Sequence, residues 1–277
     1  MDGCEKGVLQ ERLGIVFLSI FNMLHGQNEI SGIVLNETSK LPAEYVNIGI
    51  AGKNFGTVTD KNGIFNLLIE SQYKNDSLLF SCIGYEPYSI KISDLKKDNN
   101  IYLKEKSFLL DEIVVSPRIF KERTLGITSK SKFATAGFAN NKLGYELGVL
   151  MKVNKKAIIK KVNINIATCR YDTIFYRLNI YEEVNKNFEN ILREPIYINI
   201  SREEILGGSL QIDLEERNIL VNGNFLVTLE HIKELGDGGI WFCTGLKQKT
   251  YYRKTSQGNW ETAPIGISLS VVADVEK

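Results

Sequence analysis

Thr57-Val-Thr-Asp-Lys-Asn-Gly-Ile-Phe-Asn-Leu-Leu-Ile69 reads as a strand, a sharp turn and a return strand in one short stretch. The Asn and Gly of Asp60-Lys-Asn-Gly63 accept the positive φ that tight hairpins need. Beyond the turn, Phe65, Leu67 and Ile69 fall on one face because strand side chains alternate. The stretch therefore predicts an antiparallel hairpin with one buried face.

Similar segments lie on both sides of this hairpin. Ile30–Leu35 and Tyr45–Ile50 alternate, and Ser77–Ile83 is almost continuously apolar, as a central strand buried on both faces should be. Ile101–Leu103 closes the series. Roughly seven short strands separated by Gly, Asn, Asp and Pro predict a β-sandwich over residues 27–115.

Four stretches of this region also resemble a known family. They are Ile30-Ser-Gly-Ile-Val34, Gly56-Thr-Val-Thr-Asp-Lys-Asn-Gly-Ile-Phe65, Leu79-Phe-Ser-Cys-Ile-Gly-Tyr85 and Leu110-Asp-Glu-Ile-Val-Val115. In order and spacing they are similar to the carboxypeptidase-regulatory-like domain. The resemblance implies a seven-stranded, prealbumin-like sandwich that is an accessory module without the zinc site of carboxypeptidases. Such domains are common at the N-terminus of Bacteroidetes-type envelope proteins, including TonB-dependent receptors.

Two of these motifs allow a second interpretation. Asp60–Gly63 is a fragment of a calcium loop as well as a turn, but no D-x-D or distal Glu follows it, which favours the turn. Leu110–Val115 resembles a segment that, in family receptors, engages an energy-coupling partner by strand pairing. Too few residues follow for the plug and barrel of such receptors, which favours a final strand or a linker.

The first 26 residues differ from the rest. Lys6 and Arg12 precede the apolar stretch Leu13–Leu24, and His25-Gly26 follows it. An apolar core of about a dozen residues suits a signal peptide better than a membrane span. The alternative is a buried N-terminal helix. With no later apolar run of span length, we expect an exported protein without a transmembrane segment after cleavage, in the periplasm or on the surface of a Gram-negative bacterium.

Beyond the first domain, residues 116–143 lose the alternating pattern and are interpreted as a linker. Alternation returns over residues 144–277, for example in Val162–Ile166, Ile174–Ile180 and Leu210–Leu214. Eight or nine such strands with no amphipathic helix between them predict a second, jelly-roll-like β-sandwich. The fold class is therefore all-β with two sandwich domains.

Composition argues against several functions. The net charge of +1 does not favour nucleic-acid binding, and 43% hydrophobic with 24% charged residues is typical of a globular protein. His231 alone follows the leader, at the end of a strand-like run where a structural hydrogen bond is the ordinary role. We therefore predict no catalytic residue, no metal site and no cofactor.

Other reactive groups are also interpreted structurally. Cys82, Cys169 and Cys243 lack C-x-x-C spacing and lie in apolar runs, although Cys169 and Cys243 could form a disulfide in an oxidising compartment. The adjacent carboxylate pairs are read as solvated charges because neighbouring strand residues point to opposite faces. These pairs are Glu182-Glu183, Glu203-Glu204 and Glu215-Glu216.

Four aromatic residues form the candidate binding site. Trp241, Tyr251, Tyr252 and Trp260 lie near the turns Gly236–Gly239 and Ser256–Asn259. Aromatic faces at loop ends can stack on sugar rings, although core packing and cross-strand pairing are commoner uses.

The sequence therefore predicts a non-catalytic, exported envelope protein with a binding, scaffolding or adhesion role and an envelope protein or glycan as partner. The first alternative is a carbohydrate-binding protein that uses this aromatic platform. The second is a glycosidase-type hydrolase acting through separated carboxylates.

Overall fold

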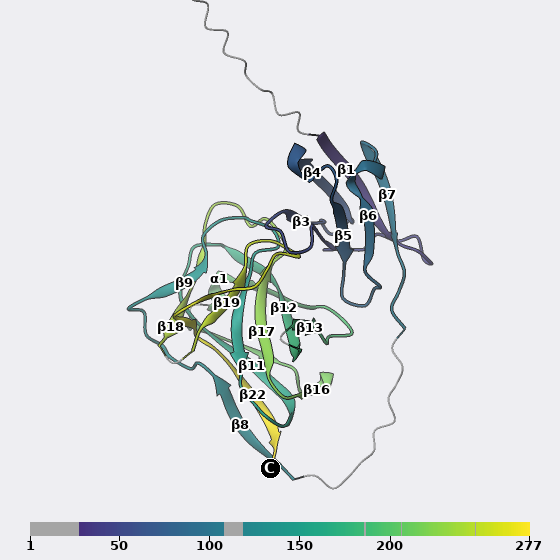
Figure 1. The fold of residues 1–277 in the computed structure, drawn as a ribbon. Coiled ribbons are helices and arrows are strands. Elements are labelled where there is room, and N and C mark those ends of the chain that lie inside the picture. Colours follow the sequence, from purple (N-terminus) through teal and green to yellow (C-terminus); the bar gives the residue numbers. More distant parts are fainter. Residues whose placement is uncertain (1–27, 108–118, 186, 206, 247) are drawn as a thin grey trace, which may run out of the picture.

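The computed structural model describes residues 28–277 apart from 108–118, 186, 206 and 247 (Figure 1). The predicted signal peptide (1–26) and the segment Leu110–Val115 lie outside the described residues. No helix in the part of the chain described here combines the length and apolarity needed to span a membrane.

The N-terminal domain is a sandwich of two sheets. One sheet has the order β4-β1-β7 and the other β3-β2-β5-β6. Pairing is antiparallel except between β1 and β7, which run parallel. The strands are β1 (Asn28–Asn36), β2 (Asn47–Gly49), β3 (Gly56–Val58), β4 (Ile64–Ile69), β5 (Ser77–Ser81), β6 (Tyr88–Lys91) and β7 (Asp98–Leu103). Short 3₁₀ turns occupy Ser71–Tyr73 and Ile92–Asp94.

The hairpin around Asp60–Gly63 forms as its sequence predicts. Oδ1 of Asp60 accepts hydrogen bonds from the backbone N–H groups of Asn62 and Ile64, both at 2.8 Å, and Gly63 has φ +72°. Phe65, which follows, is buried between the sheets. The Asp60 carboxylate is therefore committed to holding the turn.

The C-terminal domain packs a seven-stranded sheet on an eight-stranded one. The first sheet has the order β13-β12-β17-β10-β19-β20, and β14 also pairs with β12. Its strands are β10 (Glu146–Met151), β12 (Thr173–Val184), β13 (Asn187–Asn190), β14 (Ile196–Ser201), β17 (Phe225–His231), β19 (Thr250–Arg253) and β20 (Glu261–Ala263). The second contains β8 (Phe120–Gly126), β9 (Thr135–Phe138), β11 (Lys156–Cys169), β15 (Ser209–Asp213), β16 (Ile219–Asn222), β18 (Ile240–Gly245), β21 (Gly266–Ile267) and β22 (Leu269–Glu276).

The core of this domain lies between the two sheets. Leu178, Val227 and Val149 from the first sheet pack against Val162 and Val271 from the second. The α-helical segment Arg202–Ile205 and the 3₁₀ turn Glu215–Arg217 are brief connections. The predicted all-β class with sandwich domains is confirmed.

Residues 116–143, predicted as a linker, contribute two strands to this sandwich. β8 pairs antiparallel with β22 from Phe120 to Gly126, and β9 pairs with β18. β8 lies at one end of the sheet path and its Lys121–Arg123 part is exposed, so its sequence lacks the apolar alternation that marks an interior strand. The sheet therefore begins earlier than the sequence pattern predicts.

The described strands of the second domain outnumber the eight or nine predicted. β11 explains much of the difference, because this long strand pairs in succession with β16, β15 and β18 along its length, and also with β22. Short partners such as β20 and β21 have too few residues to show a period. Figure 1 shows the N-terminal domain beside one end of the larger sandwich, next to the seven-stranded sheet.

Candidate ligand-binding cleft

A row of four charged residues crosses the outer face of the seven-stranded sheet. Arg177 on β12 is opposite Glu230 on β17, Glu230 is opposite Glu146 on β10, and Glu146 is opposite Arg253 on β19. The side chains of both glutamates are fully buried, that of Arg177 is 2% exposed and that of Arg253 is 11% exposed. Two like-charged carboxylates at the centre are thus flanked by one arginine on each side.

The register places these four residues on one face. Their strand neighbours, including Leu178, Leu229 and Leu147, point the other way into the core. Because strand side chains alternate, the four charged residues must face the opposite side of the sheet from these core leucines. On that side, Arg177 bonds to residues of the first domain, whereas Arg253 packs against aromatic rings of the second.

Each arginine is bonded to its own glutamate. Arg177 Nε and Nη2 lie 3.0 and 2.8 Å from Glu230 Oε2. Arg253 Nε donates to Glu146 Oε2 at 2.7 Å. Asn179 Nδ2 donates to both carboxylates, at 2.9 Å to Glu146 Oε1 and 2.8 Å to Glu230 Oε2. The amide therefore links two groups that would otherwise repel each other.

The Glu146 carboxylate accepts further donors. Tyr181 Oη donates to Oε1 at 2.9 Å, and the Thr228 hydroxyl lies at the same oxygen. Burial raises the pKa of Glu146. The positive charge of Arg253 acts to lower this pKa, and the negative charge of Glu230 acts to raise it. Burial also favours a higher pKa for Glu230, but the positive charges of Arg177 and Arg253 together hold its pKa below the ordinary value. The two carboxylates are therefore electrostatically different although they face each other.

Arg177 also bonds to the first domain. Nη1 donates to the backbone oxygen of Tyr45 at 2.8 Å, and Nη2 donates to Asn47 Oδ1 at 2.6 Å. The ring of Tyr45 packs against Phe175 and Tyr197 of the second domain, at centroid distances of 5.1 and 5.4 Å. A fully buried guanidinium with both domains as partners fixes their relative position.

A second contact joins the turn Ser256–Asn259 to the first domain. Gln257 Nε2 donates to Ser81 Oγ at 2.5 Å, and Gln257 O accepts from the backbone N–H of Gly52 at 2.9 Å. The backbone approaches so closely that a Cβ at Gly49 would lie 2.5 Å from Ser256 O. This turn, near which the sequence analysis places the candidate aromatic residues, thus contacts the first domain.

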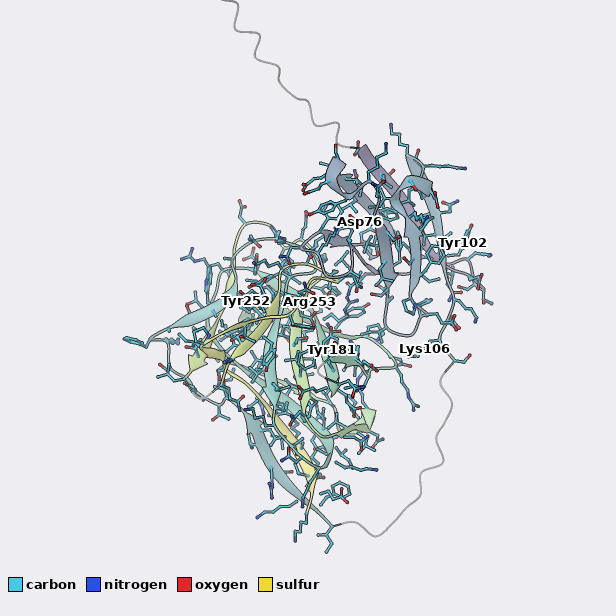
Figure 2. All side chains as sticks on the ribbon, in the orientation of Figure 1. Asp76, Tyr102, Lys106, Tyr181, Tyr252 and Arg253 are labelled. Atoms are coloured by element: carbon cyan, nitrogen blue, oxygen red, sulfur yellow. The ribbon has the colours of Figure 1, made fainter. Side chains whose placement is uncertain are left out.

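A cleft of 250 Å³ lies where the two domains meet. Figure 2 shows Arg253 and Tyr181 on the side of the sandwich that faces the first domain. Amide, hydroxyl and guanidinium groups dominate the lining, Phe188 supplies an aromatic wall, and none of the lining residues in the described part of the chain is acidic. The lining comprises Asn47, Ser81, Cys82, Ile83, Gly84, Tyr85, Lys106, Arg177, Asn179, Tyr181, Phe188, Asn190, Leu192, Arg253 and Gln257.

The structure divides the four predicted aromatic residues. Tyr251 and Trp260 share the outer face with Phe188, whose ring is 5.6 and 5.8 Å from theirs. Tyr252 packs on the core side because it follows Tyr251 in the strand, and its hydroxyl donates to Glu261. Trp241 belongs to β18 of the other sheet. The predicted set is therefore not one platform.

The partners of the aromatic cluster that were not predicted include Tyr181, whose ring lies 5.7 Å from that of Trp260. Phe188 comes from β13, and Arg253 lies 4.9 Å from the centre of the Trp260 ring. This cation–π contact connects the aromatic cluster to the row of charges. The cluster Phe188, Tyr251 and Trp260 is half-buried and borders the cleft through Phe188.

His231 lies inside the second domain. It is fully buried, 5.4 Å from the Tyr176 ring and 5.8 Å from the Phe138 ring, and neither ring nitrogen has a partner among the described residues. Burial lowers its pKa to about 4. The structural hydrogen bond expected for its side chain is therefore absent from the described structure, because the ring packs among aromatic neighbours.

The other cysteine and carboxylate groups considered in the sequence analysis are placed as follows in the structure. Cys82, Cys169 and Cys243 are free cysteines. Glu182 accepts from the Asn222 backbone and Glu204 from Ser201. The described residues contain no group of three His, Cys, Asp or Glu side chains arranged to hold a metal ion.

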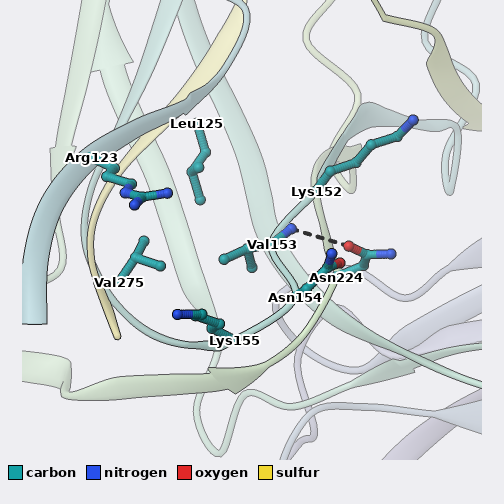
Figure 3. A pocket seen from close by; sticks show the side chains of 8 residues that line it. All are labelled: Arg123, Leu125, Lys152, Val153, Asn154, Lys155, Asn224 and Val275. Atoms are coloured by element: carbon teal, nitrogen blue, oxygen red, sulfur yellow. Dashed lines mark hydrogen bonds between the residues drawn. The ribbon is translucent and has the colours of Figure 1, made fainter. Parts of the chain in front are cut away.

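A larger cavity of 590 Å³ opens at the far end of the second domain, near the end of β22 (Figure 3). Val153, Leu125 and Val275 line it, and the exposed side chains of Arg123 and Lys155 stand at its edge. The flexible ends of Arg123 and Lys155 are exposed to solvent, whereas Asn224 in the lining is held by hydrogen bonds with the Val153 backbone N–H and with Glu183. The interdomain cleft has more such bonded polar groups, among them Arg177, Asn179 and Arg253.

The row of charges was not predicted from the sequence. A signal for it exists, since Glu146, Arg177 and Glu230 each lie next to a leucine inside a strand-like, largely apolar segment. Alternation places each residue on a face, but it does not reveal which strands lie next to each other. Long-range pairing was needed to bring the four together.

Comparison with known proteins agrees with the fold of the N-terminal domain. Residues 30–115 match the model of the CarboxypepD_reg-like domain, so the N-terminal sandwich is a domain of this type and the predicted resemblance is confirmed. The chain is also similar to the TonB-dependent receptor SusC of Bacteroides thetaiotaomicron, with 34% identity over 100 residues. That match covers 36% of this chain and 9% of the receptor, so the likeness concerns one domain.

Proposed function

We propose that this protein is a non-catalytic, exported component of a bacterial cell envelope that binds a protein or glycan partner as one rigid two-domain body. The CarboxypepD_reg-like domain and the similarity to an envelope receptor of Bacteroides thetaiotaomicron support this location. In this proposal the first domain positions the cleft and its aromatic border instead of acting as a free spacer.

The observation that carries the proposal is the position of Arg177. Its buried guanidinium bonds to Glu230 in one domain and to Tyr45 O and Asn47 in the other. A preformed cleft lowers the ordering cost of binding, because neither domain has to be immobilised when a partner arrives.

The surroundings of the ionisable groups support a non-catalytic role. Glu146 and Glu230, the two buried carboxylates nearest the cleft, are each held by an arginine and several hydrogen bonds. General acid–base catalysis needs a group that can exchange protons with a bound substrate. His231 is enclosed in the core and has no described partner that would orient it.

Capture from envelope extract tests the binding role. The immobilised mature chain should retain a specific protein or glycan that Phe188→Ala no longer retains, whereas Tyr102→Ala on the remote strand β7 should retain it. Turnover of any member of a glycan or peptide library by the purified chain would contradict the non-catalytic proposal.

A second candidate function is carbohydrate binding, favoured by the cluster of Phe188, Tyr251 and Trp260 beside an amide-lined cleft. Apolar ring faces and amide groups together are suited to a sugar. The matched test is a glycan array with Trp260→Ala and Trp241→Ala. Sugar binding at the cleft requires that only the Trp260 variant loses the signal, because Trp241 is on the other sheet.

The glycosidase alternative has less support. Retaining or inverting hydrolysis needs two separated carboxyl groups facing one site. None of the described residues lining the cleft is acidic, and the adjacent carboxylate pairs lie in connections and at a strand end, where Glu182 and Glu204 are hydrogen-bonded.

A further inference from the structure

Two neighbouring loops at one edge of the second domain carry the most exposed large apolar side chains described. Phe133 is 100% exposed and Leu246 is 87% exposed. Both side chains are apolar, and burial would remove them from water. Their exposure on two neighbouring loops therefore needs an explanation.

The structure holds these loops side by side. The backbone N–H of Thr244 donates to Ser131 O at 3.3 Å, and the Thr244 hydroxyl donates to Ala134 O at 2.7 Å. Cys243 is also opposite Thr135 in the pairing of β18 with β9. Phe133 and Leu246 therefore project from adjacent connections that are fixed by a sheet.

The charged residues next to Phe133 and Leu246 in the two loops are all lysines. Lys130 and Lys132 precede Phe133, Lys249 follows Leu246, and none of these three has an ion pair in the described structure. The loop sequences 127–138 and 240–250 contain no Asp or Glu. The neighbouring segment 262–268, which includes β21 next to β18, has no charged residue either.

We propose that this surface, consisting of Lys130, Lys132, Phe133, Leu246 and Lys249, docks on an anionic lipid bilayer. We name it the basic apolar tip. Phe133 and Leu246 enter the boundary between headgroups and acyl chains, while the lysines remain among the anionic headgroups. An amphipathic surface of this composition suits a bilayer, because apolar side chains contact the acyl chains while cationic side chains remain at the level of the headgroups.

The arrangement leaves the other end of the protein available. In Figure 1, β9 and β18 lie at the edge of the molecule away from the N-terminal domain. Docking through the basic apolar tip therefore keeps the interdomain cleft in solution. The inference rests on the loops alone and does not depend on what the cleft binds.

Vesicle co-sedimentation of the mature chain tests this inference, with vesicles of phosphatidylcholine alone and of phosphatidylcholine mixed with phosphatidylglycerol. The chain should bind the mixed vesicles at low salt and lose binding in high salt, because exposed charges are screened. Phe133→Ser with Leu246→Ser should weaken binding by about tenfold or more. Lys130→Gln with Lys132→Gln and Lys249→Gln should remove most of the dependence on salt.

The matched control is Leu41→Ser, since Leu41 is 65% exposed in the other domain and its replacement should leave vesicle binding unchanged. Circular dichroism of each variant confirms that it is folded. Absence of wild-type binding to mixed vesicles, or equal binding by the Phe133/Leu246 variant, would overturn the proposal. Capture of an acidic protein at this surface without vesicle binding would also overturn it.

Discussion

Arg177 and Glu230 face each other on the adjacent strands β12 and β17, and two nitrogens of the arginine reach a single carboxylate oxygen, Glu230 Oε2, at 3.0 and 2.8 Å. Among the described residues, the other oxygen, Glu230 Oε1, is buried without a partner. The remaining donor capacity of Arg177 is directed to Tyr45 O and Asn47 of the first domain. One ion pair within a sheet thus also provides a buried polar contact between the domains.

Arg177→Met should destabilise the protein strongly. Removal of the guanidinium leaves Glu230 as a buried charge without its partner and leaves Tyr45 O unbonded. Breaking a buried pair in this way costs about 3–5 kcal/mol. Urea denaturation measures the loss as a lower midpoint. Lys104→Met, which breaks the exposed pair with Glu86, should change stability by less than about 1 kcal/mol.

The combination Arg177→Met with Glu230→Leu should recover part of that loss. An apolar pair removes the uncompensated charge, so its effect should be smaller than the sum of the two single variants. Additive effects of the two substitutions would show that the pair does not act as a unit.

Gly49→Ala should weaken the contact between the domains. The added Cβ would lie 2.5 Å from Ser256 O and 3.0 Å from Phe55 O, both backbone atoms, so the turn Ser256–Asn259 must move. Overpacking of this kind costs about 1–3 kcal/mol. Gly207→Ala is the control because no atom lies within 4 Å of its Cβ position. A double-mutant cycle with Gln257→Ala should show less than additive loss, since both substitutions disturb one contact.

The stability of the protein should depend on pH through His231. Burial lowers its folded pKa to about 4, whereas the unfolded side chain has its ordinary value near 6.5. Between these values the unfolded chain binds a proton that the folded chain does not. Stability is therefore full above about pH 6.5 and decreases as the pH falls toward 4, by up to about 3 kcal/mol.

His231→Phe provides the control for this dependence. Phenylalanine fits among Phe138 and Tyr176 and has no titrating group. The free energies of unfolding of the two proteins should therefore diverge between pH 7 and 4, with the variant less sensitive to acid. Parallel pH profiles would show that His231 does not titrate as its burial requires.

Asp60→Ala should lower stability by about 1 kcal/mol, because Asp60 Oδ1 accepts from the backbone N–H groups of Asn62 and Ile64. Asp60→Asn should retain most of the stability, since its amide oxygen can accept the same bonds. Added calcium should leave the melting temperature unchanged in all three proteins. A calcium-dependent increase that Asp60→Asn abolishes would instead identify a calcium loop.

Local sequence explains why some features were predictable and others were not. Asp60–Gly63 contains its own turn chemistry, so the hairpin could be predicted from adjacent residues. The aromatic platform could not, because Tyr251 and Tyr252 are neighbours in sequence but lie on opposite faces of β19. Phe188, which contacts Tyr251 and Trp260, comes from a strand more than sixty residues earlier in the chain.

The all-β class and the sandwich of the first domain could be predicted from the sequence, since turn residues and two-residue alternation act over short distances along the chain. The row of Glu146, Arg177, Glu230 and Arg253, and the contact of Arg177 with the first domain, became visible in the folded protein because charged residues in strands acquire partners through strand order and register. Those relationships arise when residues distant in sequence exclude water together, and no local pattern encodes them.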